Sequence, residues 1–162
     1  MANSSAWFAL AGALGGIFLT GGFTLMTAAL SHKWTAQAEH AQEVRSTKDR
    51  LRGIFHDYLI VTNAYFHAVD RMHIKALRGE EFDPWEDVRE EYKALQEQYQ
   101  YLTISAGDES RLLARAYDMV LYGLADAVRD SNEERWSELR SETHKARDRV
   151  RLAMRAELGV AD

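Results

Sequence analysis

The histidines of one predicted helix are the residues best suited to chemistry in this sequence. His67, Asp70 and His73 read as H-x-x-D-x-x-H, and His56 and Asn63 precede them at near-helical spacing. Imidazole and carboxylate groups bind transition metals and transfer protons near neutral pH. The pattern therefore admits a metal-dependent or acid–base site, which is the third of the functional interpretations given below.

Other features weigh against such a site. Helical bundles that hold metals use Glu and Glu-x-x-His groups that project inward from several helices, and this sequence contains no Glu-x-x-His. The apolar periodicity turns His56 and His67 outward and brings His73 closer to the core, where we expect a hydrogen-bonded structural histidine. The sequence also lacks a phosphate-binding glycine loop, a nucleophile elbow and a basic-aromatic surface for nucleic acid. We predict no enzyme, no catalytic residue, no metal or cofactor, and no nucleic-acid partner.

The elements that carry these residues are predicted to be helices. The chain has one proline, no cysteine and ten glycines in 162 residues, five of the glycines in one apolar run, and it is rich in helix-forming Ala, Leu, Glu and Arg. The absence of cysteine excludes disulfides, thiol catalysis and cysteine-based zinc sites. The net charge of -5 implies no general attraction to nucleic acid. The class is all-α.

Residues 6–30 are predicted to be a transmembrane helix. This run holds no charged side chain, and its polar groups are three threonines. About 20 apolar residues span a bilayer core of about 30 Å. Gly12 and Gly16 form a GxxxG pair, which allows close helix packing against another copy or another membrane protein.

The flanking charges predict the orientation of this helix. Residues 1–5, a short tail, hold no Lys or Arg, whereas four such residues follow the apolar run within about 20 positions. The positive-inside rule then favours a single-pass protein of the cell membrane with its C-terminal domain in the cytoplasm, and an exported domain is the alternative. Residues 31–50 are predicted to be a polar helical stalk, with Lys33 and Trp34 at the membrane interface.

Residues 51–158 are predicted to form an antiparallel, up-down-up-down four-helix bundle, followed by a tail at 159–162. The first helix is expected over about 44–78 with Gly79 as its C-cap, and a second is expected to start at Asp83 and Pro84. The third opens at Asp108 and the fourth at a Ser131–Glu134 capping box. The buried face of the third helix is expected to hold Leu113, Ala116, Val120, Leu124 and Ala127, with Asp118 on the opposite face.

Two surface features and one set of aromatic residues suggest partners. The fourth helix carries Arg147, Arg151 and Arg155, which we interpret as a basic face toward anionic lipid, and acidic residues gather at the opposite end of the bundle. A solvated helix face is the alternative interpretation. Aromatic residues at core spacing can line a ligand pocket, although they usually pack a core; they are Tyr58, Tyr65, Trp85, Tyr92, Tyr99 and Trp136.

The order of segments resembles small uncharacterised actinobacterial membrane proteins. The resemblance covers residues 11–69: a glycine-rich span, then L-x-H-K-W-T at 30–35, then a charged helix leading into L-R-x-I-F-H-D-Y-L at 51–59. It implies a single-pass protein with a helical soluble domain and brings no activity with it.

Three functional interpretations follow. The first is a non-enzymatic, membrane-anchored helical bundle that scaffolds or recruits a protein partner at the membrane, with a homo-oligomer through the transmembrane helix as one form of that contact. The second is a sensor that binds a small ligand between aromatic-lined helices. The third is the metal-dependent enzyme built on His67, Asp70 and His73.

Overall fold

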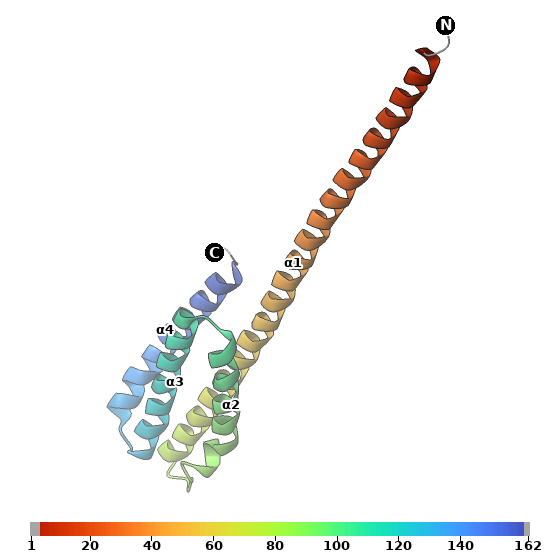
Figure 1. Cartoon of the computed structure of the whole chain (residues 1–162). Helices are drawn as coiled ribbons and strands as arrows, with labels where there is room; N and C mark the ends of the chain where they lie inside the picture. The colour runs from red at the N-terminus through yellow and green to blue at the C-terminus, as the bar shows by residue number, and fades with distance from the viewer. Residues whose placement is uncertain (1–3, 161–162) are drawn as a thin grey trace. The chain divides into compact units, whose positions relative to one another are not determined.

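The computed structural model describes the backbone of residues 4–160 and the side chains of residues 34–35 and 37–160. The described part is all-α, as the sequence predicts. Its elements are α1 (Ser4–Leu77), the short 3-10 helix η1 (Glu86–Val88), α2 (Arg89–Ser105), α3 (Asp108–Arg129) and α4 (Glu133–Leu158), and Figure 1 labels the four α-helices.

The chain divides into two compact units, Met1–Thr47 and Lys48–Asp162. In the first unit every described side chain is exposed, and 72% of Trp34 is accessible. Among the described residues, no helix has both the length and the apolar character needed to cross a membrane. The predicted transmembrane segment 6–30, with Gly12 and Gly16, lies outside the residues whose side chains are described, as does Lys33.

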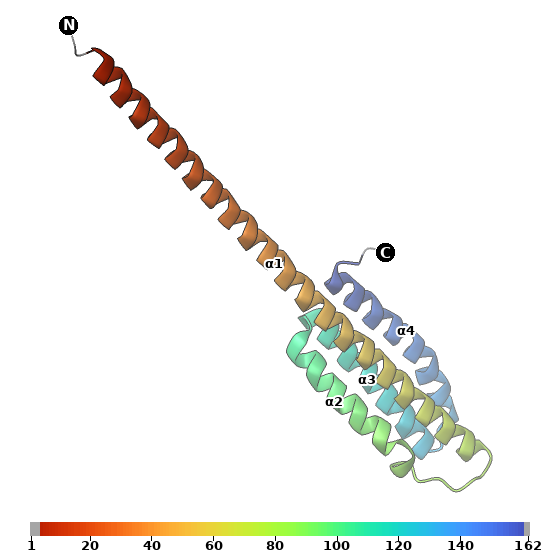
Figure 2. The ribbon, with the colours of Figure 1, turned by 90° about the vertical axis from the view of Figure 1, so that its right-hand side faces the viewer.

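The second unit is a bundle of the last part of α1 with α2, α3 and α4 (Figures 1 and 2). Lys75 of α1 lies 2.8 Å from Asp87, and Arg71 lies 3.2 Å from Glu91, so α2 runs antiparallel to α1. The Nζ of Lys48 donates to the carbonyl of Leu158, whereas His73 contacts Glu133, so α4 is also antiparallel to α1. Helix α3 returns beside α4 in the opposite direction, because Glu157 near the end of α4 accepts hydrogen bonds from Gly107 N and Ser110 Oγ.

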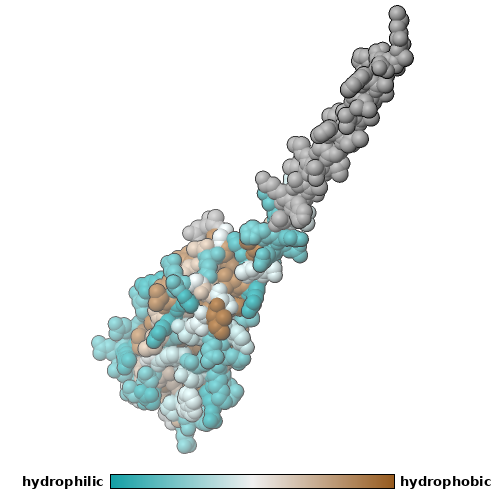
Figure 3. Space-filling view, in the orientation of Figure 1, coloured by the Kyte–Doolittle hydropathy of each residue, from teal (hydrophilic) through white to brown (hydrophobic). Residues whose placement is uncertain are grey.

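The core lies between these helices, and its largest fully buried residues are Tyr58, Tyr117, Met72, Leu95, Leu102, Leu121, Leu124, Val69 and Val150. Burying each such side chain contributes about 1.5–3 kcal/mol. Figure 3 shows mostly hydrophilic residues on one face of this unit, with smaller hydrophobic patches between them.

The predicted face of α3 is partly wrong. Leu124 and Ala127 are buried, but Ala116 is exposed and Asp118 is 4% exposed. The helix presents a face centred on Ala114, Tyr117, Leu121, Leu124 and Val128 instead. This orientation of α3 brings the Asp118 carboxylate to the hydroxyl of Tyr58. The apolar periodicity of a single helix cannot predict a contact between residues so far apart in the chain.

The predicted start of the second helix is also corrected. Asp83 Oδ1 accepts hydrogen bonds from Trp85 N at 2.8 Å and Glu86 N at 3.0 Å, so it caps the turn of η1. These bonds lower the pKa of Asp83. Helix α2 begins later, at Arg89, because Val88 has φ −125° and ψ 0°, outside the α-helical region.

Asn132, rather than Ser131, caps α4, since its side chain accepts a hydrogen bond from Arg135 N. Ser131 has φ +52° and occupies the left-handed position that ends α3. Its neighbour Asn132 donates through N to Ala127 O, and Ser131 N donates to Val128 O, the paired bonds of a Schellman motif. The predicted cap Gly79 has φ +66°, and the same pair of bonds ends α1: Gly79 N donates to Ala76 O and Glu80 N donates to Lys75 O.

Candidate functional site

The predicted histidine constellation does not form a site. His73 is 8% exposed, its ring stacks on Trp136 at 4.0 Å, and its Nε2 lies 2.9 Å from Glu133 Oε1. The prediction of a hydrogen-bonded structural histidine is confirmed. His56 and His67 are exposed, as expected. In the described part of the chain, no group of three metal-ligating side chains comes together.

Several predicted aromatic residues instead line a pocket at the side of the bundle. It has a volume of about 340 Å³ and lies between α1, η1, α2 and α3. Tyr65 of α1 and Tyr122 of α3 form an edge-to-face pair at 5.9 Å and 88°, and Tyr92 of α2 lies 5.4 Å from Tyr122. Trp85 extends the cluster, with its ring 5.3 Å from that of Tyr92 and 49% of its surface exposed. These rings form apolar walls that a ligand can contact.

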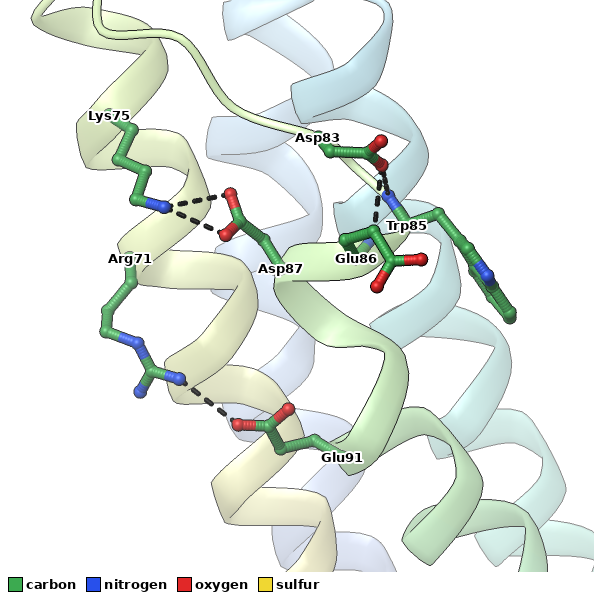
Figure 4. A network of polar contacts seen from close by, with 7 residues as sticks. All are labelled: Arg71, Lys75, Asp83, Trp85, Glu86, Asp87 and Glu91. Atoms are coloured by element: carbon green, nitrogen blue, oxygen red, sulfur yellow. Dashed lines mark hydrogen bonds and ion pairs between the residues drawn. The ribbon is translucent and has the colours of Figure 1, made fainter.

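Ion pairs join α1 to η1 and to α2 at residues next in the chain to the pocket residues Val88 and Tyr92. Figure 4 shows Lys75 and Arg71 on α1 reaching Asp87 and Glu91, while Asp83 binds the backbone of the next turn. The indole of Trp85 points away from these contacts in the same view. The hydrogen bonds to Asp83 fix the backbone at Trp85, which is 49% exposed.

The remaining lining residues give the pocket a polar rim. Asp126 lies 2.9 Å from Arg129, and both line the pocket, as do Pro84, Val88 and Ala125. The hydroxyl of Tyr122 accepts a hydrogen bond from Gln96 Nε2 at 2.6 Å, which leaves its proton available for donation. Burial raises the pKa of Tyr65 and of Tyr122 well above the ordinary value, so both remain neutral.

A buried carboxyl group, that of Asp118 on α3, faces α1 inside the bundle. Tyr58 Oη is 2.7 Å from Asp118 Oδ1 and donates also toward Ala114 O at 3.0 Å. Burial raises the pKa of Asp118 to about 7, and the hydrogen bond from Tyr58 opposes that shift. The pKa of Tyr58 is raised as well, first by burial and then by Asp118. This pair is enclosed by the core and acts as a structural contact.

The basic face predicted on α4 is only partly exposed. Arg151 is exposed and lies 3.9 Å from Asp148, Arg155 is exposed, and Arg147 is half-buried beside α1. The acidic end is partly neutralised by neighbouring cations, because several of its carboxylates pair with Lys75, Arg71, Arg78, Arg89 and Arg129. That end of the bundle is therefore not a uniformly acidic surface.

Sequence reasoning missed Tyr122 and Asp118. A signal for Asp118 was present, because one acidic residue interrupts the apolar run A-Y-D-M-V-L-Y-G-L, a position where a charge must find a buried partner. Tyr122 stands four residues after it and had no separate signal.

Comparisons of the chain with models of known protein families, with curated proteins and with solved structures find no match.

Proposed function

We propose that the protein is a non-enzymatic, membrane-tethered helical bundle that recruits a protein partner, and that the aromatic pocket is its recognition site. The observation that carries this proposal is the half-exposed Trp85, whose ring lies 5.3 Å from that of Tyr92 in the lining of a pocket of about 340 Å³ that Tyr65 and Tyr122 also line. Binding energy in protein interfaces concentrates on a few Trp, Tyr and Arg residues that lie in such pockets.

The rim of the pocket indicates the chemistry of the partner. Asp83, Glu86, Asp126 and Asp130 lie at or next to its lining residues, against Arg129 and Arg89. The local charge is therefore negative. Faces of Trp and Tyr attract cations as well as apolar groups. A partner segment with an apolar or aromatic side chain next to a basic residue fits this combination.

The membrane part of the proposal rests on the sequence. The uncharged run at 6–30 has the length of a spanning helix, and the Lys and Arg residues that follow it favour a cytoplasmic bundle. Gly12 and Gly16 are proposed to mediate packing with another copy of this helix or with another membrane protein. The basic residues of α4 are proposed to favour the neighbourhood of an anionic leaflet.

A sensor of a small ligand is the second candidate. Its support is the same pocket, whose volume lies at the lower end of the range for small-molecule sites. The core residues Leu95, Leu121 and Val150 have 0% exposure, whereas the pocket opens at the side of the bundle, so the pocket is the place for such a ligand.

Photo-crosslinking of the full chain in intact cells tests the proposal. A photoreactive residue at Glu86, exposed at the rim, is expected to give one discrete protein adduct in the membrane fraction. Tyr92→Ala and Asp126→Lys should each reduce the adduct at least tenfold. Glu109→Lys, an exposed acid at the other end of α3, should leave it unchanged.

Loss of the adduct in all three variants, or no adduct at all, would contradict recruitment through this pocket. Intact mass measurement of the purified chain separates the second candidate. A bound species of small mass that Tyr92→Ala removes would favour the sensor.

A further inference from the structure

Arg147 on α4 differs from its charged neighbours because it has no ion-pair partner among the described residues. Its Nε atom is buried and lacks a hydrogen-bond partner. Buried donors in native proteins nearly always have partners, so one left without any requires an explanation, such as a bound ion or water. Arg89 also has a buried Nε without a partner, but its Nη1 lies 2.7 Å from Glu86, and its charge is compensated.

The sequence around Arg147 explains the missing partner. Carboxylates three or four residues away on a helix are the ordinary partners of an arginine. Those positions hold Thr143, His144, Val150 and Arg151, and none of them is acidic. Nearby Arg149, in contrast, lies 3.2 Å from Glu142.

Arg147 lines an open groove between α1 and α4. The groove has a volume of about 370 Å³, and its described lining residues include no acid: they are His56, Leu59, Ile60, Asn63, Arg147 and Arg151. Arg147 also influences the pKa of a buried residue, Tyr117 of α3. Burial raises the pKa of Tyr117 to about 12, and the positive charge of Arg147 is the leading influence in the opposite direction.

The other lining residues supply complementary groups. The amide of Asn63 and the imidazole of His56 come from one face of α1, about two turns apart, and both side chains are exposed. Arg151 stands one turn from Arg147 and adds a second guanidinium, whose contact with Asp148 is long at 3.9 Å. Ile60, 52% exposed, and Leu59 form an apolar side of the groove.

We propose that this groove binds a phosphate-type oxyanion, with Arg147 as its principal contact. A planar guanidinium with free donors matches the oxygens of a phosphate, and Arg is the residue favoured for such recognition. The anion compensates the positive charge of Arg147, which pairs with no carboxylate among the described residues. The phosphate can belong to a soluble phosphoester or to a lipid headgroup, and in the second case the apolar side of the groove contacts the adjoining glycerol or acyl carbons.

Calorimetric titration of inorganic phosphate into the full chain in a nonionic detergent tests this inference. The wild-type chain should bind phosphate saturably, and Arg147→Met should weaken binding at least tenfold. Arg149→Met is the matched control, because it removes the same charge from the same helix at a paired, exposed position, and it should change the affinity less than twofold. Asn63→Leu, a substitution at an exposed position of α1, is a second variant that should also weaken phosphate binding. It tests the inference if Arg147→Met fails to fold.

Repeating the titration in nanodiscs distinguishes the two sources. A phosphate affinity that is the same in phosphatidylcholine discs with and without phosphatidic acid assigns the groove to a soluble phosphoester. An affinity that falls when phosphatidic acid is present assigns it to a lipid headgroup. Absence of saturable binding, binding that Arg147→Met retains, or equal loss in Arg149→Met would overturn the inference. None of these outcomes depends on the aromatic pocket.

Discussion

Two polar groups beside α1 in the bundle differ in whether they have a partner inside the protein, although other groups between α1 and α4, such as His73 with Glu133, are paired. On the side that meets α3, the hydroxyl of Tyr58 bonds to Asp118 and to Ala114 O, so each of these groups has an internal partner. On the side that meets α4, the half-buried Arg147 has none in the described structure. Because an unsatisfied buried donor costs about 1–3 kcal/mol, the first arrangement contributes to folding and the second is explained by a ligand from outside. The comparison distinguishes a structural contact, that of Tyr58 with Asp118, from the proposed binding site at Arg147.

The largest expected effect is a pH dependence from Asp118. Its pKa is about 7 in the folded chain and about 4 when unfolded, so the folded state holds the proton more tightly. This contribution to stability is complete below about pH 4 and is lost as the pH rises to about 7. The loss is on the order of 4 kcal/mol, from about three pKa units.

Chemical denaturation of the wild-type chain and of Asp118→Asn between pH 4 and 8 measures this effect. The free energy of unfolding of the variant should increase relative to that of the wild type as the pH rises. Parallel curves for the two proteins would show that Asp118 is not held as a neutral acid, and the contrast between the two sides of α1 would weaken.

A smaller effect is expected from the hydroxyl that Asp118 contacts. Tyr58→Phe removes the donor to two buried acceptors and should lower the free energy of unfolding by about 1–3 kcal/mol at pH 8. Tyr101→Phe is the matched control, because Tyr101 is 51% exposed, and its effect should stay within about 0.5 kcal/mol. Equal effects of the two substitutions in urea denaturation would mean that the Tyr58 hydroxyl contributes nothing specific.

Local sequence chemistry predicted much of the fold. Gly79 ends α1 through a positive φ that favours glycine, and Asp108 opens α3, so helix ends marked by a single residue type were found. Asn132 and Ser131 were confused, because both are cap-forming residues and only the backbone conformation shows that Ser131 belongs to the end of α3. The residue type alone does not show whether a residue ends one helix or begins the next.

The sites were less predictable because they depend on contacts between helices. Periodicity placed Asp118 outward, yet the hydroxyl of Tyr58 gives it a buried partner 60 positions away in the chain. The aromatic stripe of Tyr65 and Tyr92 was recognised, but the pocket needs Tyr122 from a third helix. The basic residues Arg147 and Arg151 were predicted as one uniform face, whereas packing against α1 half-buries the first and leaves the second exposed.

The most direct test of the difference between the two sides is the unfolding free energy of the wild type and Arg147→Met, with and without phosphate. Without phosphate, Arg147→Met should be as stable as the wild type, or more stable by up to about 1 kcal/mol, because it removes an unsatisfied donor. With phosphate at about ten times its dissociation constant, the wild type should gain about 1.4 kcal/mol and the variant nothing. Equal gains in both proteins, or a variant destabilised by several kcal/mol without phosphate, would show that Arg147 serves the fold rather than a ligand.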